Sequence, residues 1–401
     1  MIPFKPTEAS CMNKSRHIIL LLFLLLHIPF QAFVQESKVT LNGYVKDLYM
    51  FYTSENQTPE AGTNNLSTNI IHNRLNMKWY ATQKLTTVIE MRNRLMFGNL
   101  VKKFPAYKQM VDVDNGLIDL SWISAQSNNW FLHSMIDRMY FDYSSAHWQI
   151  RAGRQRVNWG VNLVWNPNDI FNTFSYFDFD YEERPGTDAL RIQYYTGATS
   201  SAELVYKPGR TLEKTATAAL YRFARWNYDF QFIGGQAGND WITGSGWSGN
   251  ICGAGFRGEI THFEPLNHQS FRATVASVSS DYTFKNSLYL HFSVLYNSSG
   301  KTENAGRMNL LFNSEMSAKQ LSFARWSLFG QISKPITPLF SGNFSGIVNP
   351  SDGSMYLGPT FTYSIASNIE LMLTSQLFFG KSGSEFGDIG QLIFGRIRWS
   401  F

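Results

Sequence analysis

The sequence contains few cysteines, no long apolar run after residue 32 and no cluster of basic residues. Only one of its two cysteines, Cys252, follows the amino-terminal apolar run, which excludes a disulfide framework. No later stretch has the roughly 20 consecutive apolar residues that a transmembrane helix needs. The formal net charge is only +5, and without a Lys/Arg-rich run it argues against binding nucleic acid.

Metal ligands are also sparse, because the eight histidines are scattered. No pair of them stands at metal-ligand spacing near Cys, Asp or Glu. We therefore expect neither a metal site nor a cofactor.

The amino-terminal residues have the composition of a secretory signal peptide. Lys14 and Arg16 supply positive charge, and Ala32 is a small residue suited to cleavage after the apolar run 18–30. That run of about 13 residues is too short to cross a bilayer as a helix. We expect residues 1–32 to be a signal peptide and residues 33–401 to form a single domain.

The carboxyl-terminal segment 391–401 alternates between apolar and charged residues. Successive side chains of a strand point to opposite faces, which places Ile393, Gly395, Ile397, Trp399 and Phe401 on one face and Arg396, Arg398 and Ser400 on the other. In an exported chain this pattern favours a membrane β-barrel, because only helices and closed barrels satisfy their backbone hydrogen bonds in hydrocarbon. The segment resembles the assembly signal of Gram-negative outer-membrane proteins. The resemblance implies that Trp399 and Phe401 are recognised by the barrel assembly machinery.

Strand-like segments of about ten residues with alternating polarity recur along the chain. At about 20–25 residues per strand and connection, we expect an all-β transmembrane antiparallel barrel of about 16 strands, within a range of roughly 14 to 18. Short connections at 144–147, 285–286 and 366–368 contrast with long ones at 53–66, 98–116, 160–186 and 298–320. This contrast is typical of short periplasmic turns and long extracellular loops. The Gly-rich stretch 215–263 does not divide into clear strands, and 117–126 is either a strand or part of a loop.

The same alternation assigns basic side chains to the interior. If Leu75 faces lipid, Arg74 faces the lumen, and a charge on the lipid face costs about 2–4 kcal/mol near the midplane. Applied to every clear strand, this predicts a basic pore lining of Arg74, Lys78, Arg92, Arg94, Arg138, Arg151, Arg191, Arg396 and Arg398. The alternative for any one arginine is an ion pair with Glu90, Asp137 or Asp142 that only fills the interior.

The most distinctive stretch is 153–160, Gly-Arg-Gln-Arg-Val-Asn-Trp-Gly, which precedes an Asn-Pro sequence at 166–167 and Arg-Pro-Gly at 184–186. A strand with this beginning and end, leading into an Asn-Pro loop, resembles a porin-like family of bacterial outer-membrane barrels. The resemblance is not specific for a solute. Arg154 and Arg156 have the opposite parity to Arg151, so we expect a bulge at Gly153 or a loop base inside the barrel.

The connection 160–186 combines acidic with aromatic residues. Its six aromatics, Phe171, Phe174, Tyr176, Phe177, Phe179 and Tyr181, would form a large apolar patch in water, so we expect the connection to fold against the inner wall. Its acids are Asp169, Asp178, Asp180, Glu182 and Glu183. Opposite a basic wall they would create a transverse field in a constriction. The alternative is that they are solvated or bind divalent cations that bridge lipopolysaccharide.

These observations favour a porin-like channel in the outer membrane for passive diffusion of small hydrophilic solutes, anionic or saccharide ones among them. The alternative is a non-channel barrel whose long loops serve polysaccharide export, adhesion or envelope anchoring. The expected partners are outer-membrane lipid, lipopolysaccharide, the barrel assembly machinery and the solutes. Whether the barrel is a homotrimer or a monomer stays open.

An enzyme is not expected. His291 and Ser293 are two residues apart on one expected strand and resemble the catalytic pair of outer-membrane phospholipases only in spacing. The alternating apolar residues Leu288, Leu290, Phe292 and Val294 take the lipid face, which turns both polar side chains into the lumen and away from a lipid substrate.

Overall fold

The computed structural model describes residues 38–58, 63–178, 180, 186–267, 270–306 and 316–401. The expected signal peptide and its boundary with the barrel domain at residues 32–33 lie outside the described residues. Residues 39–401 form one compact unit. In chain order its elements are β1 (Val39–Thr58), β2 (Thr63–Tyr80), β3 (Leu85–Phe97), α2 (Asn99–Lys103), α3 (Tyr107–Val111), β4 (Ser121–Gln126), β5 (Trp130–Ser144), β6 (Trp148–Gln155), β7 (Thr187–Gly197), β8 (Ser200–Lys207), a short 3-10 helix (Leu212–Lys214), β9 (Ala216–Arg225), β10 (Tyr228–Ala237), β11 (Asp240–Ile251), β12 (Ala254–Pro265), β13 (Ala273–Thr283), β14 (Tyr289–Asn297), β15 (Trp326–Thr337), β16 (Phe340–Asn349), β17 (Ser354–Ala366), β18 (Ile369–Phe379) and β19 (Gln391–Ser400).

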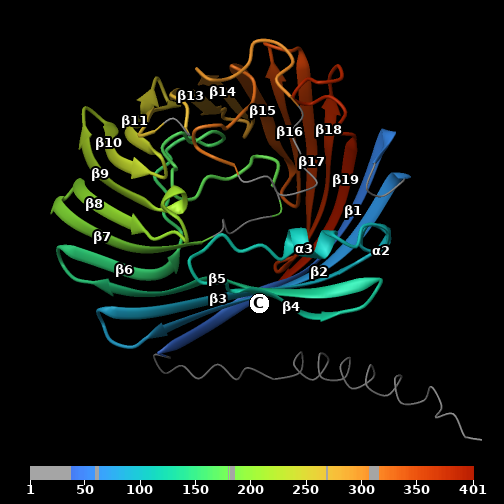
Figure 1. The fold of residues 1–401 in the computed structure, drawn as a ribbon, viewed down its shortest axis with the longest axis horizontal. Coiled ribbons are helices and arrows are strands. Elements are labelled where there is room, and N and C mark those ends of the chain that lie inside the picture. Colours follow the sequence, from blue (N-terminus) through green and yellow to red (C-terminus); the bar gives the residue numbers. More distant parts are fainter. Residues whose placement is uncertain (1–37, 59–62, 179, 181–185, 268–269, 307–315) are drawn as a thin grey trace, which may run out of the picture. The chain divides into compact units, whose positions relative to one another are not determined.

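The strands form a closed antiparallel barrel (Figure 1). Of the 19 strands in the sheet, all except β4 follow one another around the ring, and β1 pairs with β19 to close it, which gives an 18-stranded barrel in the described part of the chain. The all-β barrel prediction is confirmed, and the range of 14 to 18 strands is met at its upper limit. The favoured number of 16 was wrong.

Two regions explain the wrong number. The unclear stretch 215–263 contains four strands, β9 to β12. The expected long connection at 53–66 was also wrong, because most of it is strand: β1 and β2 run for 20 and 18 residues and pair as far as Thr58 and Thr63.

The connections at the two ends of the barrel differ in length. At the end where Gly43 and Phe401 exchange two backbone hydrogen bonds of 3.0 Å, the connections are short, for example 198–199, 226–227, 252–253 and 367–368. At the other end they include 98–120, 156–186, 298–325 and 380–390. Barrels of this kind place their short turns on the periplasmic side.

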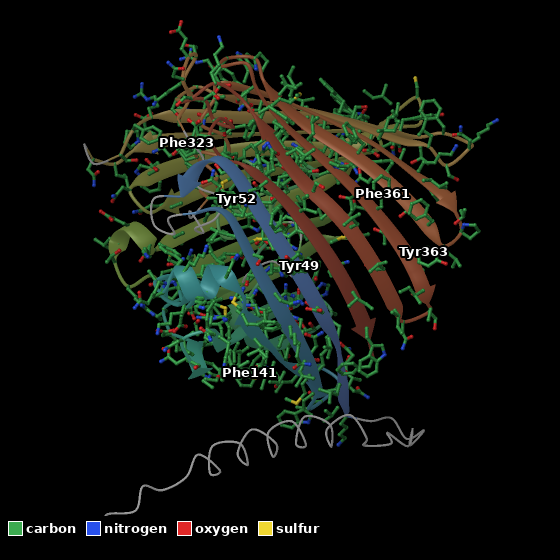
Figure 2. All side chains as sticks on the ribbon, turned by 90° about the vertical axis from the view of Figure 1, so that its right-hand side faces the viewer. Tyr49, Tyr52, Phe141, Phe323, Phe361 and Tyr363 are labelled. Atoms are coloured by element: carbon green, nitrogen blue, oxygen red, sulfur yellow. The ribbon has the colours of Figure 1, made fainter. Side chains whose placement is uncertain are left out.

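The two faces of the wall differ in polarity. Large apolar side chains cover the outside, among them Phe141, which is 59% exposed, and Phe361 and Tyr363 at 44% each (Figure 2). Tyr52 is buried inside, where its hydroxyl donates to the Ile389 carbonyl at 2.9 Å. Among the described residues, no helix is long and apolar enough to cross a bilayer.

Between β3 and β5 the chain makes a detour that the sequence only hinted at. α2 and α3 pack next to inward side chains of the wall, where Val101 and Tyr107 contact Met96 and Phe131. β4 then pairs with the first residues of β5, Phe131 to Met135, at the end of the barrel that carries the long connections. The open alternative for 117–126 is therefore settled: Ser121–Gln126 is a strand, although an additional one outside the main ring.

Candidate pore and constriction loop

The loop between β6 and β7, residues 156–186, begins where the wall strand is interrupted. Gly153 has a φ of +117°, a conformation that L side chains rarely adopt. Arg154 follows it and turns away from the Arg151 side, donating to Asp188 at 2.9 Å and to Asp114 at 2.6 Å. The irregularity expected at Gly153 thus anchors the base of the loop to β7 and to the connection after β3.

The first half of the loop is attached to β8, β10, β11, β12 and β13 by polar contacts. Trp159 donates through Nε1 to Glu203 at 2.7 Å, and its carbonyl accepts from Gln231, also at 2.7 Å. Asn162 contacts Ser277 and Ser279 on β13, and Asn168 contacts the Ser245 carbonyl and Thr261 at 3.1 and 2.7 Å. These contacts keep this half of the loop on one side of the inner wall.

One carboxylate contributes most of this attachment. Glu259 on β12 is 1% exposed and accepts hydrogen bonds from three loop backbone N–H groups, those of Val161, Asn162 and Asn168. The latter two are 2.8 and 2.9 Å long. Hydrogen bonds to an ionised carboxylate are stronger than neutral ones. Glu259 was not predicted from the sequence, because it lies in the stretch 215–263 that did not divide into clear strands.

The second half of the loop contacts a different part of the wall, formed by β15, β17 and β18. The Phe177 ring packs edge-on against Tyr356 and Phe386, with ring centres 4.9 and 5.8 Å away. Gln376 on β18 donates to the Phe177 carbonyl at 2.6 Å. Tyr176 contacts Phe329 at 5.1 Å, and burial raises the pKa of its hydroxyl. The connection therefore crosses the interior from the β8–β13 side to the β15–β18 side, inside the ring of strands in Figure 1.

The predicted acids of the loop occupy different environments. Asp180 contacts the buried Lys46 at 2.8 Å and Arg396 at 3.5 Å. Asp169 is 1% exposed, so it does not present its carboxylate to open solvent, whereas Asp178 is exposed. Glu182 and Glu183 lie outside the described residues. Burial lowers the pKa of the loop residue Arg156, and the nearby Asp169 carboxylate opposes that shift.

The basic part of the wall on β2, β3 and β5 is an ion-pair network and not a row of isolated cations. Arg74 is 1% exposed and contacts both Glu90, at 2.6 Å, and Asp137. Arg92 lies 3.4 Å from Asp137, and Arg138 lies 3.6 Å from Glu90. A register shift opposite Glu90 and Met91 makes Asp137 an extra residue of β5, so Asp137 and Arg138 both point inward. Strand alternation alone did not predict that inward turn.

The remaining predicted cations have mixed surroundings. Arg94 contacts His133 at 3.0 Å, and Arg398 lies over the Tyr44 ring at 4.5 Å. Arg396 also contacts Glu370 at 2.5 Å, whereas Lys78 is exposed near the end of β2.

In three ion pairs of the wall the arginine is more accessible to solvent than its acid. Arg151 contacts Asp142 at 2.5 Å and Arg191 contacts Glu203 at 2.8 Å. The Arg191 side chain is 19% exposed but that of Glu203 only 2%, and Arg138 is 18% exposed against 10% for Glu90. In each of these pairs solvent reaches the guanidinium more than the carboxylate. In the pairs of Lys46 and Arg396 the order is reversed, because Asp180 and Glu370 are more accessible than their cations.

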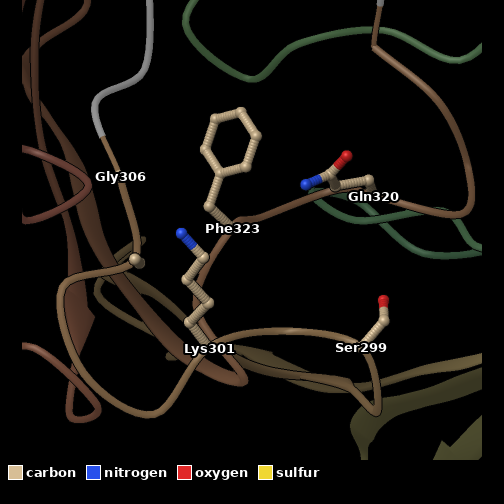
Figure 3. A pocket seen from close by; sticks show the side chains of 6 residues that line it. Ser299, Lys301, Gly306, Gln320 and Phe323 are labelled. Carbon is tan, nitrogen blue, oxygen red and sulfur yellow. The ribbon is translucent and has the colours of Figure 1, made fainter.

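A cavity of about 480 Å³ lies between the base of the loop and β7 to β11. It is lined in part by Gly160, Val161, Ser201, Arg222, Asp229 and Gln231. Arg222 and Asp229 come from the unclear stretch 215–263, so the sequence did not predict them. A second hollow of about 340 Å³, around Lys301, Gln320 and Phe323, lies among the long connections (Figure 3). Its one charged side chain gives no indication of a ligand.

The long connections around that hollow are joined by Glu385. Its carboxylate accepts hydrogen bonds from Ser322 at 2.8 Å, from the Phe323 N–H at 3.1 Å and from Asn349 at 2.6 Å. Burial raises the pKa of this carboxyl, and the hydrogen bonds partly offset that effect.

His291 and Ser293 both point inward and are buried. The Ser293 hydroxyl donates to the Val278 carbonyl at 3.3 Å, and the His291 ring packs against Phe329 at 5.2 Å. Each side chain thus has a structural contact of its own. Within the described ranges, no group of three or more His, Cys, Asp or Glu side chains is arranged to hold a metal ion.

We expect Arg74→Met to lower the free energy of unfolding by about 3–5 kcal/mol, because it leaves buried carboxylates without their principal cation. Lys78→Met on the same strand is the matched control, since Lys78 is exposed and its loss should change stability by less than about 0.5 kcal/mol. Urea unfolding of the barrel in lipid vesicles, followed by tryptophan fluorescence, measures both. Equal stabilities for the two variants would contradict the network.

The fold, a closed ring of antiparallel strands that is apolar outside and polar inside, defines the class of outer-membrane β-barrel proteins. The structure resembles Acinetobacter baumannii OccAB4 with a TM-score of 0.58 at 9% identity, covering 92% of this chain and 99% of that one. For Acinetobacter baumannii OccAB3 the TM-score is 0.56 at 7% identity, with 90% and 99% covered. For Pseudomonas aeruginosa OccK7 (OpdD) it is 0.52 at 7% identity, with 91% and 99% covered.

These similarities confirm, at the level of the fold, the resemblance to porin-like outer-membrane barrels. No protein-family model matches the sequence. A comparison with curated proteins found no match either.

Proposed function

We propose that this protein is an outer-membrane channel through which small hydrophilic solutes, anions in particular, diffuse passively. The observation that carries the proposal is the path of the loop between β6 and β7, which contacts Glu259 on β12 and Gln376 on β18. A segment attached to β12 and to β18, which lie six strands apart in the ring, narrows an 18-stranded barrel without filling it, because barrels of this size enclose an aqueous lumen.

The charges in the lumen support a preference for anions. The acids of the pairs Arg138–Glu90 and Arg191–Glu203 are less accessible than their arginines. The loop acid Asp180 has Lys46 and Arg396 as cationic neighbours, which reduces its own effect on a passing anion. The loop and the basic wall together form a constriction with a transverse field, the device by which pores orient charged solutes.

We expect reversal potentials in planar bilayers to show weak anion selectivity at 0.1 M KCl. The selectivity should fall at 1 M KCl, since the Debye length shrinks from about 10 Å to about 3 Å. The triple variant Arg138→Gln/Arg151→Gln/Arg191→Gln should lose most of it at both salt concentrations. Lys334→Gln is the control, because Lys334 lies on the outer face of β15 and should not affect the permeating ions.

A clear cation preference of the wild type would contradict the anion part of the proposal. A folded barrel that conducts no ions would contradict the channel itself. In that case the alternative of a non-channel barrel with a surface role in polysaccharide export, adhesion or envelope anchoring would take its place.

The remaining sequence expectations belong to the same proposal. Residues 1–32 direct export, Trp399 and Phe401 are recognised by the barrel assembly machinery, and the short connections face the periplasm while the long ones face outward. The partners are membrane lipid, lipopolysaccharide and the permeating solutes.

A further inference from the structure

The second half of the loop between β6 and β7 contacts more than the strands of the wall. The Phe177 ring packs against Tyr356 on β17 and Phe378 on β18, with ring centres 4.9 and 5.6 Å away. It also packs edge-on against Phe386 at 5.8 Å, and Phe386 belongs to the connection 380–390 between β18 and β19. This connection therefore supplies part of the surface that holds the loop.

The connection 380–390 is tightly folded. The Ser384 hydroxyl donates to the Lys381 carbonyl at 2.6 Å, and residue 387 is a glycine because any Cβ there would collide with the same carbonyl oxygen. Near its end, the Ile389 carbonyl accepts from the hydroxyl of Tyr52 on β1 at 2.9 Å. Loops of this length that pack on themselves are compact units.

Glu385, the neighbour of Phe386, joins this unit to two other long connections. Its own backbone N–H donates at 2.8 Å to Asp352, in the connection between β16 and β17. Its carboxylate is 1% exposed and accepts hydrogen bonds between 2.6 and 3.2 Å long from the Ser322 hydroxyl, the N–H groups of Phe323 and Ala324, and the Asn349 side chain. In the described part of the chain no Lys, Arg or His contacts this carboxylate, so these donors compensate for its burial.

Two adjacent side chains thus connect different parts of the lumen. Glu385 is attached to the connections 298–325 and 350–353, and Phe386 is packed against the loop that narrows the barrel. Both side chains are almost fully buried, so neither can shift without moving its neighbours. A displacement of the long connections is therefore transmitted to Phe177 through a continuous set of contacts.

We propose that the connection 380–390 is a clamp that fixes the second half of the loop between β6 and β7, with Glu385 as the positioning residue that ties the clamp to the long connections. In this arrangement the long connections control how firmly the constriction is held. The position of the loop does not depend on whether the barrel conducts, whereas the consequence for ion flux rests on the proposed function.

The first test measures the loop itself, by hydrogen–deuterium exchange of the folded barrel in detergent micelles. Peptides covering 171–178 should exchange roughly twofold to tenfold faster in Phe386→Ala, which is the factor that corresponds to one aromatic pair. Peptides covering 157–168 should not change, since Glu259 holds that half of the loop.

The matched control for this test is Phe323→Ala. The Phe323 ring lines the hollow among the long connections (Figure 3), and in the described part of the chain it makes no ring contact with the loop. Its removal should leave the exchange of 171–178 unchanged. Equal exchange in wild type and Phe386→Ala, or equal acceleration in Phe386→Ala and Phe323→Ala, would overturn the clamp.

The second test asks whether Glu385 acts through Phe386. Glu385→Ala should also accelerate the exchange of 171–178, but Glu385→Ala/Phe386→Ala should exchange no faster than the faster single variant, because residues that act through one contact are not additive. Glu385→Gln keeps one acceptor oxygen, so its smaller acceleration provides the same comparison if Glu385→Ala does not fold. Accelerations that multiply in the double variant would overturn the role of Glu385.

Single-channel recording then separates the clamp from the proposed function. Phe386→Ala should show larger open-channel current fluctuations than wild type and Phe323→Ala. Faster exchange with unchanged fluctuations in a conducting barrel would overturn the control of the constriction by the clamp. A folded wild type that conducts no ions would contradict the channel, while the exchange of 171–178 would still decide whether the clamp holds the loop.

Discussion

Deletion of residues 171–181 is expected to raise the unit conductance roughly twofold or more, since pore width sets the ion flux. The deletion removes Tyr176 and Phe177, which hold the second half of the loop against Tyr356 and Phe329. It also removes Asp180 from its contacts with the wall. The anion preference should change along with the conductance, because the constriction that enforces contact between ion and wall is gone.

The measurement is single-channel recording in planar bilayers, with heat-modifiable gel mobility to verify folding. A control deletion removes 210–213 from the connection between β8 and β9, where Arg210 contacts Leu117 and, in the described part of the chain, no residue contacts 171–178 or 180. Its conductance should stay close to that of the wild type. An unchanged conductance after deletion of 171–181 would place the constriction elsewhere and favour the surface-function alternative.

The sequence predicted the strands whose outward residues contact only lipid. Strands such as β14 and β18 alternate regularly, because their outward residues meet hydrocarbon and their inward residues meet polar groups. β11 breaks the pattern with inward glycines at 244 and 246. A Cβ on Gly246 would come within 2.9 Å of the Asn168 amide nitrogen, and one on Gly244 within 3.0 Å of its oxygen. The wall has glycines where the loop packs against it. Because of these glycines, the sequence of β11 does not show the regular alternation that predicts a strand.

The candidate site was predictable in part for a related reason. Strand alternation identified Arg74, Arg92 and Arg138 as inward, since a charge is costly on the lipid face. Asp137 was named as one possible ion-pair partner, but alternation placed it on the outer face, because it points inward only through a local shift of register in β5. Glu259 was not predicted because it lies on β12. The neighbouring strand β11 lacks the alternating pattern where the loop packs against it, so this region did not divide into strands.

The second large effect is expected from Glu259→Gln. The carboxylate uses one oxygen for the N–H groups of Val161 and Asn162 and the other for that of Asn168. A glutamine keeps only one acceptor oxygen and turns an NH₂ group toward the remaining donor. At least one charge-assisted hydrogen bond is lost, which costs about 1.5–3 kcal/mol. That loss corresponds to a roughly tenfold to hundredfold larger population of detached loop.

The expected readout is a rise in open-channel current noise and flickering in Glu259→Gln, with barrel folding preserved because no contact between strands is removed. Protease cleavage within residues 161–178 should become faster by the same factor. Asp281→Asn is the matched control, since this inner-wall carboxylate contacts Arg257 on β12 and touches no loop residue in the described part of the chain. Noise equal to that of the control would show that the loop does not depend on Glu259. If the noise increased in both variants, loss of negative charge in the lumen, and not release of the loop, would be its cause.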